Sequence, residues 1–317
     1  MQSYLNNLTN TETLGAIDLG SNALRAVIAR KSKNNQITVI KSFREPLRLG
    51  EDVFAKGRIS PEKMQKTEEA FIKLLYLFSE YNVTNARAMA TSAMRESKNS
   101  QVLINRIVNS TGIQIETIDG DLEAGLICNA VKGQVNLKKR TALLMDIGGG
   151  STELSLVKNE KVIAAQSFNV GTVRLLDYKN HDDLEKIIKL ELDKMLGFIK
   201  LHVKAKDLNL MIGTGGNLRR IGKIRKKILG KSSSELASFN EITHMEEAIS
   251  SMSYVERIRK LELDQNRADV ILPAIMLTYN LMKELKMKEI HLPKVGLKEG
   301  IILSMLPTPP KKLILKD

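Results

Sequence analysis

Two short segments of this chain carry the same pattern of residues that could bind phosphate. Residues 16–27 read AIDLGSNALRAV, and residues 145–156 read MDIGGGSTELSL. Each is an apolar run followed by Asp, an aliphatic residue, Gly, a cluster of small residues and a second apolar run. This order predicts two strands joined by a tight turn. Glycine-rich turns present backbone N–H groups to phosphate oxygens, so the repeat indicates a duplicated, phosphate-handling protein.

The second turn is the stronger candidate for a phosphate site. Its three consecutive glycines let the main chain approach a ligand closely, and the following serine adds a hydroxyl donor. The candidate phosphate-binding residues are Ser21 and Asn22 in the first turn and Gly148, Gly149, Gly150 and Ser151 in the second. The alternative is two plain hairpin turns, in which glycine serves only a positive φ and Asn22 is an ordinary turn residue.

Carboxylates stand beside both turns. Asp146 and Glu153 flank the second turn, and Asp18 ends the strand before the first. Carboxylate oxygens, water and phosphate oxygens are the ligands that Mg²⁺ prefers in proteins. We therefore expect Asp146, Glu153 and Asp18 to hold Mg²⁺ (or Mn²⁺) against bound phosphates.

A third glycine cluster, residues 213–216 (GTGG), follows a predicted strand and opens a predicted helix over residues 216–227. Backbone donors and the positive helix end favour an anion at Gly215 and Gly216. The cluster is neither GxGxxG nor GxxxxGK[ST], which argues against a Rossmann dehydrogenase and a Walker-type NTPase. The helix carries six basic residues, Arg219, Arg220, Lys223, Arg225, Lys226 and Lys227. They form either a solvated face or a path for a long polyanion.

The order of the predicted elements repeats in the two halves of the chain. Three strands are followed by alternating helices and strands, twice over, which predicts an α/β fold with a mixed sheet in each half. We expect the boundary in the polar segment 132–140, giving domains 1–131 and 132–299. A helix over about 300–317 is expected to pack back on the first domain, although three prolines near the end oppose regular structure.

Composition narrows the class of protein. The net charge of +13 indicates a polyanionic partner, or else serves only solubility. Aromatic residues make up 4% of the chain and no recognition module is evident, so nucleic acid is disfavoured as a partner. The single cysteine, Cys128, lies in an apolar helical stretch and reads as a buried thiol. With no secretory leader and no apolar run of about 18 residues, we expect a cytoplasmic protein without a membrane segment.

Seven segments, in order from residue 18 to residue 301, resemble the exopolyphosphatase and guanosine pentaphosphate phosphatase family of the actin-like superfamily. They are DLGSNALR (18–25), ATSAMRES (90–97), DGDLEAGLI (119–127), DIGGGSTEL (146–154), GTGG (213–216), NRADVILPA (266–274) and VGLKEGI (295–301). DIGGGSTEL is the most specific of these motifs.

The resemblance implies a fold and an activity. The fold is a pair of actin-like (ribonuclease H-like) domains, each a mixed five-stranded sheet with flanking helices, with a cleft between them. The activity is release of terminal orthophosphate from inorganic polyphosphate, or of the 5′ γ-phosphate from guanosine pentaphosphate. Partners are then polyphosphate or guanosine penta- or tetraphosphate, and a second copy in a homodimer. Glu123 matches the catalytic base and Arg95 a phosphate ligand; by itself, Glu123 reads as a first-turn acid that stabilises the helix dipole.

The chain departs from the family pattern at three positions. Leu122 stands where the family often has a second acid, Gly125 where many members carry Arg, and Ala23 where many carry Ser. The Leu122 departure leaves the candidate catalytic Glu123 in place. The Gly125 and Ala23 departures each remove a phosphate contact that other members can make, and they therefore bear on the preferred substrate length. Two other functions remain open on the same fold: an ATP-dependent kinase or ATPase, and a non-catalytic regulator that binds polyphosphate or alarmone.

Overall fold

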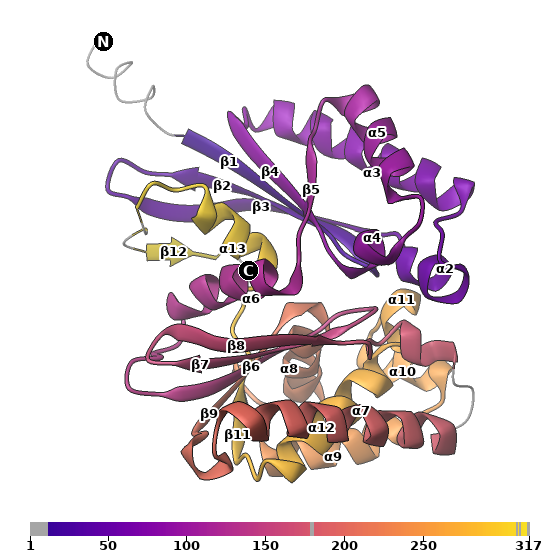
Figure 1. Ribbon diagram of the computed structural model, residues 1–317, viewed down its shortest axis with the longest axis vertical. Helices are drawn as coiled ribbons and strands as arrows, with labels where there is room; N and C mark the ends of the chain where they lie inside the picture. Colours follow the sequence, from indigo (N-terminus) through magenta and orange to yellow (C-terminus); the bar gives the residue numbers. More distant parts are fainter. Residues whose placement is uncertain (1–11, 178–180, 309, 311, 316–317) are drawn as a thin grey trace. The chain divides into compact units, whose positions relative to one another are not determined.

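The computed structural model describes residues 12–177, 181–308, 310 and 312–315, which form two compact units (Figure 1). The first unit takes the described residues of Met1–Asp119 and of Gly296–Asp317. The second takes those of Gly120–Val295. The chain therefore leaves the first unit once and returns to it near its end.

The first unit is built on a mixed sheet. In spatial order its strands are β12 (Lys312–Ile314), β3 (Gln36–Pro46), β2 (Ala23–Lys31), β1 (Glu12–Leu19), β4 (Asn85–Ala90) and β5 (Ile115–Thr117). β1, β2 and β3 form an antiparallel meander, whereas β4 pairs parallel with β1 and β5 parallel with β4. The carboxyl ends of β1 and β4 therefore meet at one edge of the sheet.

Helices cover this sheet. They are α2 (Leu49–Lys56), α3 (Pro61–Glu80), α4 (Ser92–Glu96), α5 (Ser100–Thr111) and α13 (Leu297–Ser304). Helix α3 begins as its sequence predicts, since the Ser60 hydroxyl accepts a hydrogen bond from the Lys63 N–H and Pro61 takes the first helical position. Helix α13 packs on β1, β2 and β4, which ties the returning chain to the first sheet.

The second unit repeats the plan. In spatial order its strands are β10 (Leu236–Ser238), β11 (Glu289–His291), β9 (Leu210–Thr214), β6 (Thr141–Ile147), β7 (Thr152–Lys158) and β8 (Lys161–Phe168). β6, β7 and β8 are an antiparallel meander, and β9 pairs parallel with β6 as β4 does with β1. Five strands have the same topology in both units, which confirms the duplicated mixed α/β fold, whereas the sixth strand pairs with β3 in the first unit and with β11 in the second.

The second unit holds most of the helices. They are α6 (Gly120–Lys132), α7 (His181–His202), α8 (Gly215–Leu229), α9 (Phe239–Ser250), α10 (Tyr254–Leu261), α11 (Gln265–Ala268) and α12 (Ile271–Glu284), with 3₁₀ turns at Arg174–Asp177 and Ala205–Asp207. β7 and β8 lie between α6 and α7, and both helices pack on them (Figure 1). With both faces covered, β6 and β7 are buried along nearly their whole length.

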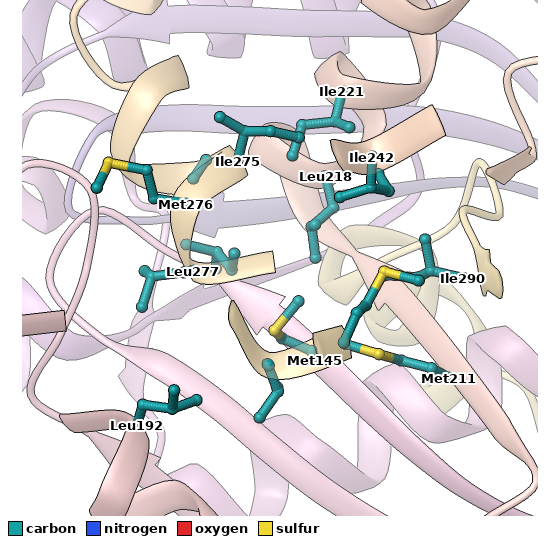
Figure 2. Packing of buried hydrophobic residues seen from close by; sticks show 14 of the residues in the cluster. Met145, Leu192, Met211, Leu218, Ile221, Ile242, Ile275, Met276, Leu277 and Ile290 are labelled. Carbon is teal, nitrogen blue, oxygen red and sulfur yellow. The ribbon is translucent and has the colours of Figure 1, made fainter. Parts of the chain in front are cut away.

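Methionine and branched aliphatic residues fill the core of the second unit. Figure 2 shows Met145 and Met211, from the neighbouring strands β6 and β9, close to Leu218 of α8 and Ile290 of β11. All four side chains are buried. Flexible methionine fills the irregular gaps that aromatic residues fill in other cores. The packing fixes the start of α8 against the carboxyl end of β6, where the glycine clusters lie.

The structure corrects three expectations about the fold. Each sheet has six strands, not five, because the three-residue edge strands β12 and β10 are too short to show a sequence period. The final helix ends at Ser304, and Lys312–Ile314 pair in parallel with Gln36–Thr38 despite the nearby prolines. Helix α6, expected in the first domain, groups with the second unit because it packs on β7 and β8.

Two smaller expectations hold. Cys128 is buried, with 1% of its surface exposed, and burial raises the pKa of its thiol. The thiol is therefore part of the packing of α6.

No helix within the described residues is long and apolar enough to cross a membrane.

One ion pair ties α8 to α9. Arg225 donates to both carboxylate oxygens of Glu241, at 2.9 and 2.8 Å, and Glu241 also accepts from the Ser238 N–H at 2.9 Å in a capping box. The hydrogen bonds from Arg225 outweigh burial and lower the pKa of Glu241 to about 2. A carboxyl that titrates at about 2 when folded and near 4.5 when unfolded stabilises the fold above pH 4.5, and this stabilisation is lost as pH falls toward 2.

We predict that Glu241→Gln lowers the free energy of unfolding by about 2 to 3 kcal/mol at pH 7. The deficit should shrink as pH falls from 5 toward 3, because the wild-type carboxyl then takes up a proton. Urea unfolding across this pH range measures it. Glu256→Gln, in the exposed capping box with Ser253, is the matched control and should cost less. Equal losses in the two variants, or a deficit independent of pH, would contradict the assignment.

Candidate functional site

The first phosphate-binding candidate is the turn between β1 and β2. Gly20 N–H donates to the Ala23 carbonyl at 3.2 Å and closes the turn. The Ser21 hydroxyl lies 2.7 Å from the Ser92 hydroxyl and accepts from the Ala93 N–H at 3.2 Å. Ser21 thus joins the turn to the start of α4, which follows β4 at the same edge of the sheet. The serine is 4% exposed, so its position is set by the protein.

Asn22 has hydrogen-bond partners for its backbone carbonyl but, among the described residues, none for its side-chain oxygen. Its backbone carbonyl accepts from the N–H groups of Leu47 and Arg48, at 3.1 and 3.0 Å. Its side-chain oxygen is buried and has no hydrogen-bond partner among the described residues. Leaving a buried polar atom unpaired costs about 1–3 kcal/mol, and such atoms in native proteins commonly await a ligand or water. This favours Asn22 as a ligand-binding residue over an ordinary turn residue.

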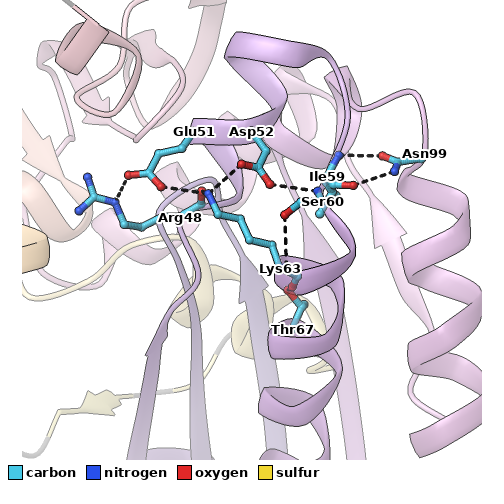
Figure 3. Close-up of polar contacts among 8 residues, drawn as sticks. All are labelled: Arg48, Glu51, Asp52, Ile59, Ser60, Lys63, Thr67 and Asn99. Atoms are coloured by element: carbon cyan, nitrogen blue, oxygen red, sulfur yellow. Dashed lines mark hydrogen bonds and ion pairs between the residues drawn. The ribbon is translucent and has the colours of Figure 1, made fainter.

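A polar network fixes the segment that holds Asn22 (Figure 3). The Lys63 ammonium donates to the Arg48 carbonyl at 2.6 Å and forms ion pairs with Glu51 at 3.0 Å and Asp52 at 3.3 Å. Burial raises the pKa of Asp52, but hydrogen bonds from Ser60 and the charge of Lys63 outweigh it and lower the pKa. These contacts hold helices α2 and α3 together, next to the segment that contacts Asn22.

Arg95 lies on α4 in the same unit. Its guanidinium donates to the Ile118 carbonyl at 2.7 Å, and the side chain is half-buried. One side of the guanidinium is therefore used to hold the chain after β5. Its role as a phosphate ligand stays a prediction.

The second candidate is the turn between β6 and β7, which we call the glycine loop (residues 148–151). Asp146 and Glu153 are cross-strand partners, and Gly148 N–H donates to the Ser151 carbonyl at 2.9 Å. In the described part of the chain, the glycines with positive φ are Gly57, Gly112, Gly215 and Gly230. The three glycines of the loop therefore do not serve a left-handed turn, contrary to the alternative reading of the sequence.

The carbonyls of the three glycines in the loop all accept hydrogen bonds from the segment 170–174. The Gly148 carbonyl accepts from the Thr172 N–H at 3.0 Å, and the Gly149 carbonyl accepts from those of Val173 and Arg174 at 2.8 and 3.1 Å. The Gly150 carbonyl accepts from the Arg174 side chain at 2.9 Å. A trans peptide directs its N–H opposite to its C=O. Fixing three carbonyls on one side thus directs the next three N–H groups, of residues 149–151, to the other.

The hydrogen bonds from the segment 170–174 require its backbone to lie close to the backbone of the glycine loop at Gly171. A Cβ atom there would lie 2.5 Å from backbone atoms of both Gly149 and Gly150. Backbone atoms cannot move aside as a flexible side chain does, so the position requires glycine. A row of N–H groups with one direction is a nest suited to an anion.

Asp146 is fixed at the third glycine cluster. Thr214, opposite Asp146 on β9, donates its hydroxyl to the carboxylate at 3.0 Å. Gly215 has a φ of +80°, and a Cβ atom on it would lie 2.1 Å from an Asp146 oxygen. Helix α8 starts at Gly215 and Gly216 without a side-chain cap from Thr214. The first N–H groups of α8 therefore lie beside the half-buried Asp146 carboxylate.

Glu153 and Glu123 are both buried acids of the second unit, each 7% exposed. Glu153 accepts hydrogen bonds from the Ser151 hydroxyl and, at 3.1 Å, from the Ser167 hydroxyl. Glu123 lies in the first turn of α6, whose first residue, Gly120, approaches the Ser167 side chain. Ser167 thus connects the helix that carries Glu123 to the carboxylate of Glu153.

The oxygen donors here fit a hard divalent cation. Mg²⁺ usually binds one or two carboxylates and completes its shell with water and substrate phosphates. Asp146 and Glu153 supply two carboxylates across one strand pair. Within the described residues no group of three or more His, Cys, Asp or Glu could hold a metal by itself. Asp18 is 8% exposed and belongs to the first unit.

Sequence reasoning missed four residues that build the site. They are Ser92, Ser167, Gly171 and Thr214. Thr214 stands inside a motif already singled out, and only its strand pairing shows that it serves Asp146. Ser167 and Gly171 lie outside every glycine-rich motif, so contacts distant in sequence were needed to find them.

Comparison with known proteins gives consistent results. The chain is 29% identical over 294 residues to the bifunctional 3-dehydroquinate synthase/phosphatase of Fusobacterium nucleatum, covering 86% of this chain but only 43% of that protein. It is 26% identical over 305 residues to exopolyphosphatase 1 of Mycobacterium tuberculosis, covering 92% of this chain and 88% of that one.

A solved structure confirms the fold class. The crystal structure of an exopolyphosphatase from Cytophaga hutchinsonii matches with a TM-score of 0.85 and 26% identity, over 93% of this chain and 97% of that one. The model of the Ppx/GppA phosphatase family matches residues 27–309, which cover the whole second unit, with its glycine loop, and most of the first. The chain therefore belongs to the Ppx/GppA phosphatase family.

Proposed function

We propose that this protein is a phosphohydrolase that releases terminal orthophosphate from a phosphoanhydride chain. Inorganic polyphosphate is the leading substrate, and the 5′ γ-phosphate of guanosine pentaphosphate presents the same terminal anhydride. The observation that carries the proposal is the glycine loop, whose N–H groups are aligned by the segment 170–174 in the unit that also holds the buried acids Glu153 and Glu123 and the half-buried Asp146. Membership of the Ppx/GppA family supports it.

Catalysis of this reaction is mainly charge stabilisation and positioning of water. The terminal phosphoryl group is negatively charged and repels a nucleophile. Preorganised N–H groups of residues 149–151 would hold its oxygens without reorganisation during reaction. The first N–H groups of α8, at Gly215 and Gly216, would add donors at a positive helix end. Ser21, Asn22 and Arg95 are the candidate phosphate contacts of the first unit.

Glu123 is the proposed general base. The water oxygen forms a bond to the terminal phosphorus while the bond from that phosphorus to the bridging oxygen breaks. The water proton passes to the Glu123 carboxylate, and the bridging oxygen leaves with the shortened chain. Burial keeps this carboxylate away from bulk water, which suits a group that must take a proton at a fixed place.

We also propose Mg²⁺ as the cofactor, with Asp146 and Glu153 as its protein ligands and Asp18 as a further candidate. Bound there, the ion would neutralise charge on the phosphate oxygens. Thr214 and Gly215 keep the Asp146 carboxylate in place, and Ser151 and Ser167 do the same for Glu153. We further propose that the protein is cytoplasmic and forms a homodimer.

The direct test compares phosphate release from polyphosphates of several lengths, guanosine pentaphosphate and ATP. Release from polyphosphate or guanosine pentaphosphate in the absence of ATP supports the proposal. Activity confined to ATP would identify a kinase or ATPase instead. Binding of these ligands without any release would identify a regulator.

We predict that Glu123→Gln keeps the fold and substrate binding but lowers kcat by about 10²–10⁴-fold, because the amide cannot accept the proton of the attacking water. Asp121→Asn is the matched control: Asp121 is an exposed acid in the same helical turn. If Glu123 only stabilised the helix dipole, the two variants would lose activity alike. Steady-state phosphate release measures both.

We predict that Asp146→Asn and Glu153→Gln each shift the Mg²⁺ titration of activity to higher concentration. Removing one negative ligand weakens the attraction for a divalent cation. Glu116→Gln, an exposed acid paired with Arg87, is the control. Titration curves that match wild type in both site variants would rule out these ligands.

We predict that Gly171→Ala raises KM for substrate more than tenfold, because the added methyl group displaces the glycine loop and misdirects its N–H groups. Gly197→Ala is the control, since a Cβ atom there meets nothing within 4 Å and alanine suits a helix. Thermal unfolding reports whether each variant is folded. A folded Gly171→Ala protein with wild-type KM would contradict the role of the segment 170–174.

A further inference from the structure

Asn217, in the first turn of α8, connects the two glycine clusters of the second unit. Its side-chain amide donates to the Ile147 carbonyl at 2.8 Å and to the Thr172 hydroxyl at 3.2 Å. Ile147 ends β6, directly before the glycine loop, and Thr172 lies in the segment 170–174 that holds this loop. One side chain thus joins α8, which starts in the third glycine cluster, to the strand before the glycine loop and to the segment that supports the loop.

The hydrogen bond to Ile147 takes the place of a strand contact. β6 and β9 pair as far as Asp146 and Thr214, and the chain then turns from β9 into α8. The Ile147 carbonyl lies one residue beyond this last pair, so β9 has no residue left to pair with it. The Asn217 amide donates to this carbonyl instead. A carbonyl can only accept, which fixes the amide nitrogen of Asn217 toward Ile147.

The hydrogen bond to Thr172 continues to the glycine loop. Thr172 is fully buried, and both its hydroxyl and its N–H donate to the Gly148 carbonyl, at 3.3 and 3.0 Å. Because the single hydroxyl proton goes to Gly148, the Thr172 oxygen accepts from Asn217. The contacts therefore run in one direction, from Asn217 through Thr172 to Gly148. They fix the peptide group whose N–H belongs to Gly149, the first of the proposed phosphate donors.

Asn217 also controls the peptide group before this one. The carbonyl of the peptide between Ile147 and Gly148 accepts from Asn217, and its N–H donates to the Ser151 carbonyl at 2.9 Å. Two successive peptides at the start of the glycine loop thus depend on one residue of α8. Neither the loop nor the first turn of α8 can shift against the other without breaking these hydrogen bonds.

Another asparagine of the second unit shows what a purely local contact looks like. Asn280 of α12 is half-buried, as Asn217 is, and its side-chain amide donates to the Met276 carbonyl at 2.8 Å. This hydrogen bond stays within one helix. The contacts of Asn217 join α8, β6 and the segment 170–174, and they lie between two proposed sets of phosphate donors.

We propose that Asn217 is a positioning residue that fixes the spacing between two sets of phosphate donors, the N–H groups of residues 149–151 and those of Gly215 and Gly216. The inference rests on the proposed function and adds how the two sets bind one substrate. A ligand with two linked phosphate groups gains affinity from two sets of donors only when their spacing matches the ligand. A ligand with one phosphate group engages one set and gains nothing from the spacing.

The test is equilibrium binding of two matched ligands that water does not cleave, methylphosphonate with one phosphonate group and methylenediphosphonate with two. Calorimetry measures binding of the diphosphonate, and ³¹P NMR that of methylphosphonate, at one fixed concentration of free Mg²⁺. The variant is Asn217→Ala. The matched control is Asn280→Ala, which loses a hydrogen bond of the same kind and length in the same unit. Thermal unfolding verifies that each protein is folded.

We expect Asn217→Ala to weaken binding of methylenediphosphonate by about tenfold or more, and binding of methylphosphonate by less than about threefold. Asn280→Ala should leave both affinities unchanged. Thr172→Val, which keeps the shape of the side chain but removes its hydroxyl, is the second variant and should show the same selective loss. The double variant should lose less than the product of the two single fold-losses, because both residues belong to one chain of contacts.

Several outcomes would overturn the inference. An equal loss for the two ligands would show that Asn217 supports the glycine loop alone. Wild-type affinity in a folded Asn217→Ala protein, or single fold-losses that multiply fully in the double variant, would show that the chain of contacts does not set the spacing. If Asn217→Ala does not fold, Thr172→Val decides by the same comparison. Because neither ligand is cleaved, a protein that shows the selective loss but releases no phosphate from polyphosphate would refute the proposed function alone.

Discussion

The site depends on the direction of three peptide groups. The carbonyls of residues 148–150 all accept hydrogen bonds from residues 172–174, and planar trans peptides then direct the following N–H groups the opposite way. Gly171 makes this possible, since a side chain there would collide with the loop. An anion site made of main chain needs such support, because its donors have no side-chain freedom with which to adjust.

Charge organises the rest of the second unit around that loop. The buried Glu153 and Glu123 and the half-buried Asp146 are acids near a site proposed for a polyanion, which is unfavourable unless cations and hydroxyl donors compensate. The Thr214 hydroxyl donates a hydrogen bond to Asp146, and the Ser167 hydroxyl donates one to Glu153. The basic residues Arg219, Arg220 and Lys223 lie farther along α8.

Much of this arrangement follows from local sequence. The paired segments around Asp18 and Asp146 predicted both hairpins, and the alternation of elements predicted the duplicated mixed sheets. Edge strands of three residues, such as β12, carry too few residues for a period to be visible. The grouping of α6 with the second unit and the roles of Ser167 and Gly171 depend on contacts with residues that are distant in the sequence. Such tertiary contacts leave no local pattern.

The central claim is that water attacks the terminal phosphorus of a phosphoanhydride held at the glycine loop. Hydrolysis of polyphosphate in water enriched in ¹⁸O, without ATP, tests this claim directly by mass spectrometry of the products. The account predicts one ¹⁸O atom in each orthophosphate released and none in the shortened chain, because the bond broken is between the terminal phosphorus and the bridging oxygen. Label in the shortened chain, or release of phosphate only when ATP is added, would contradict it.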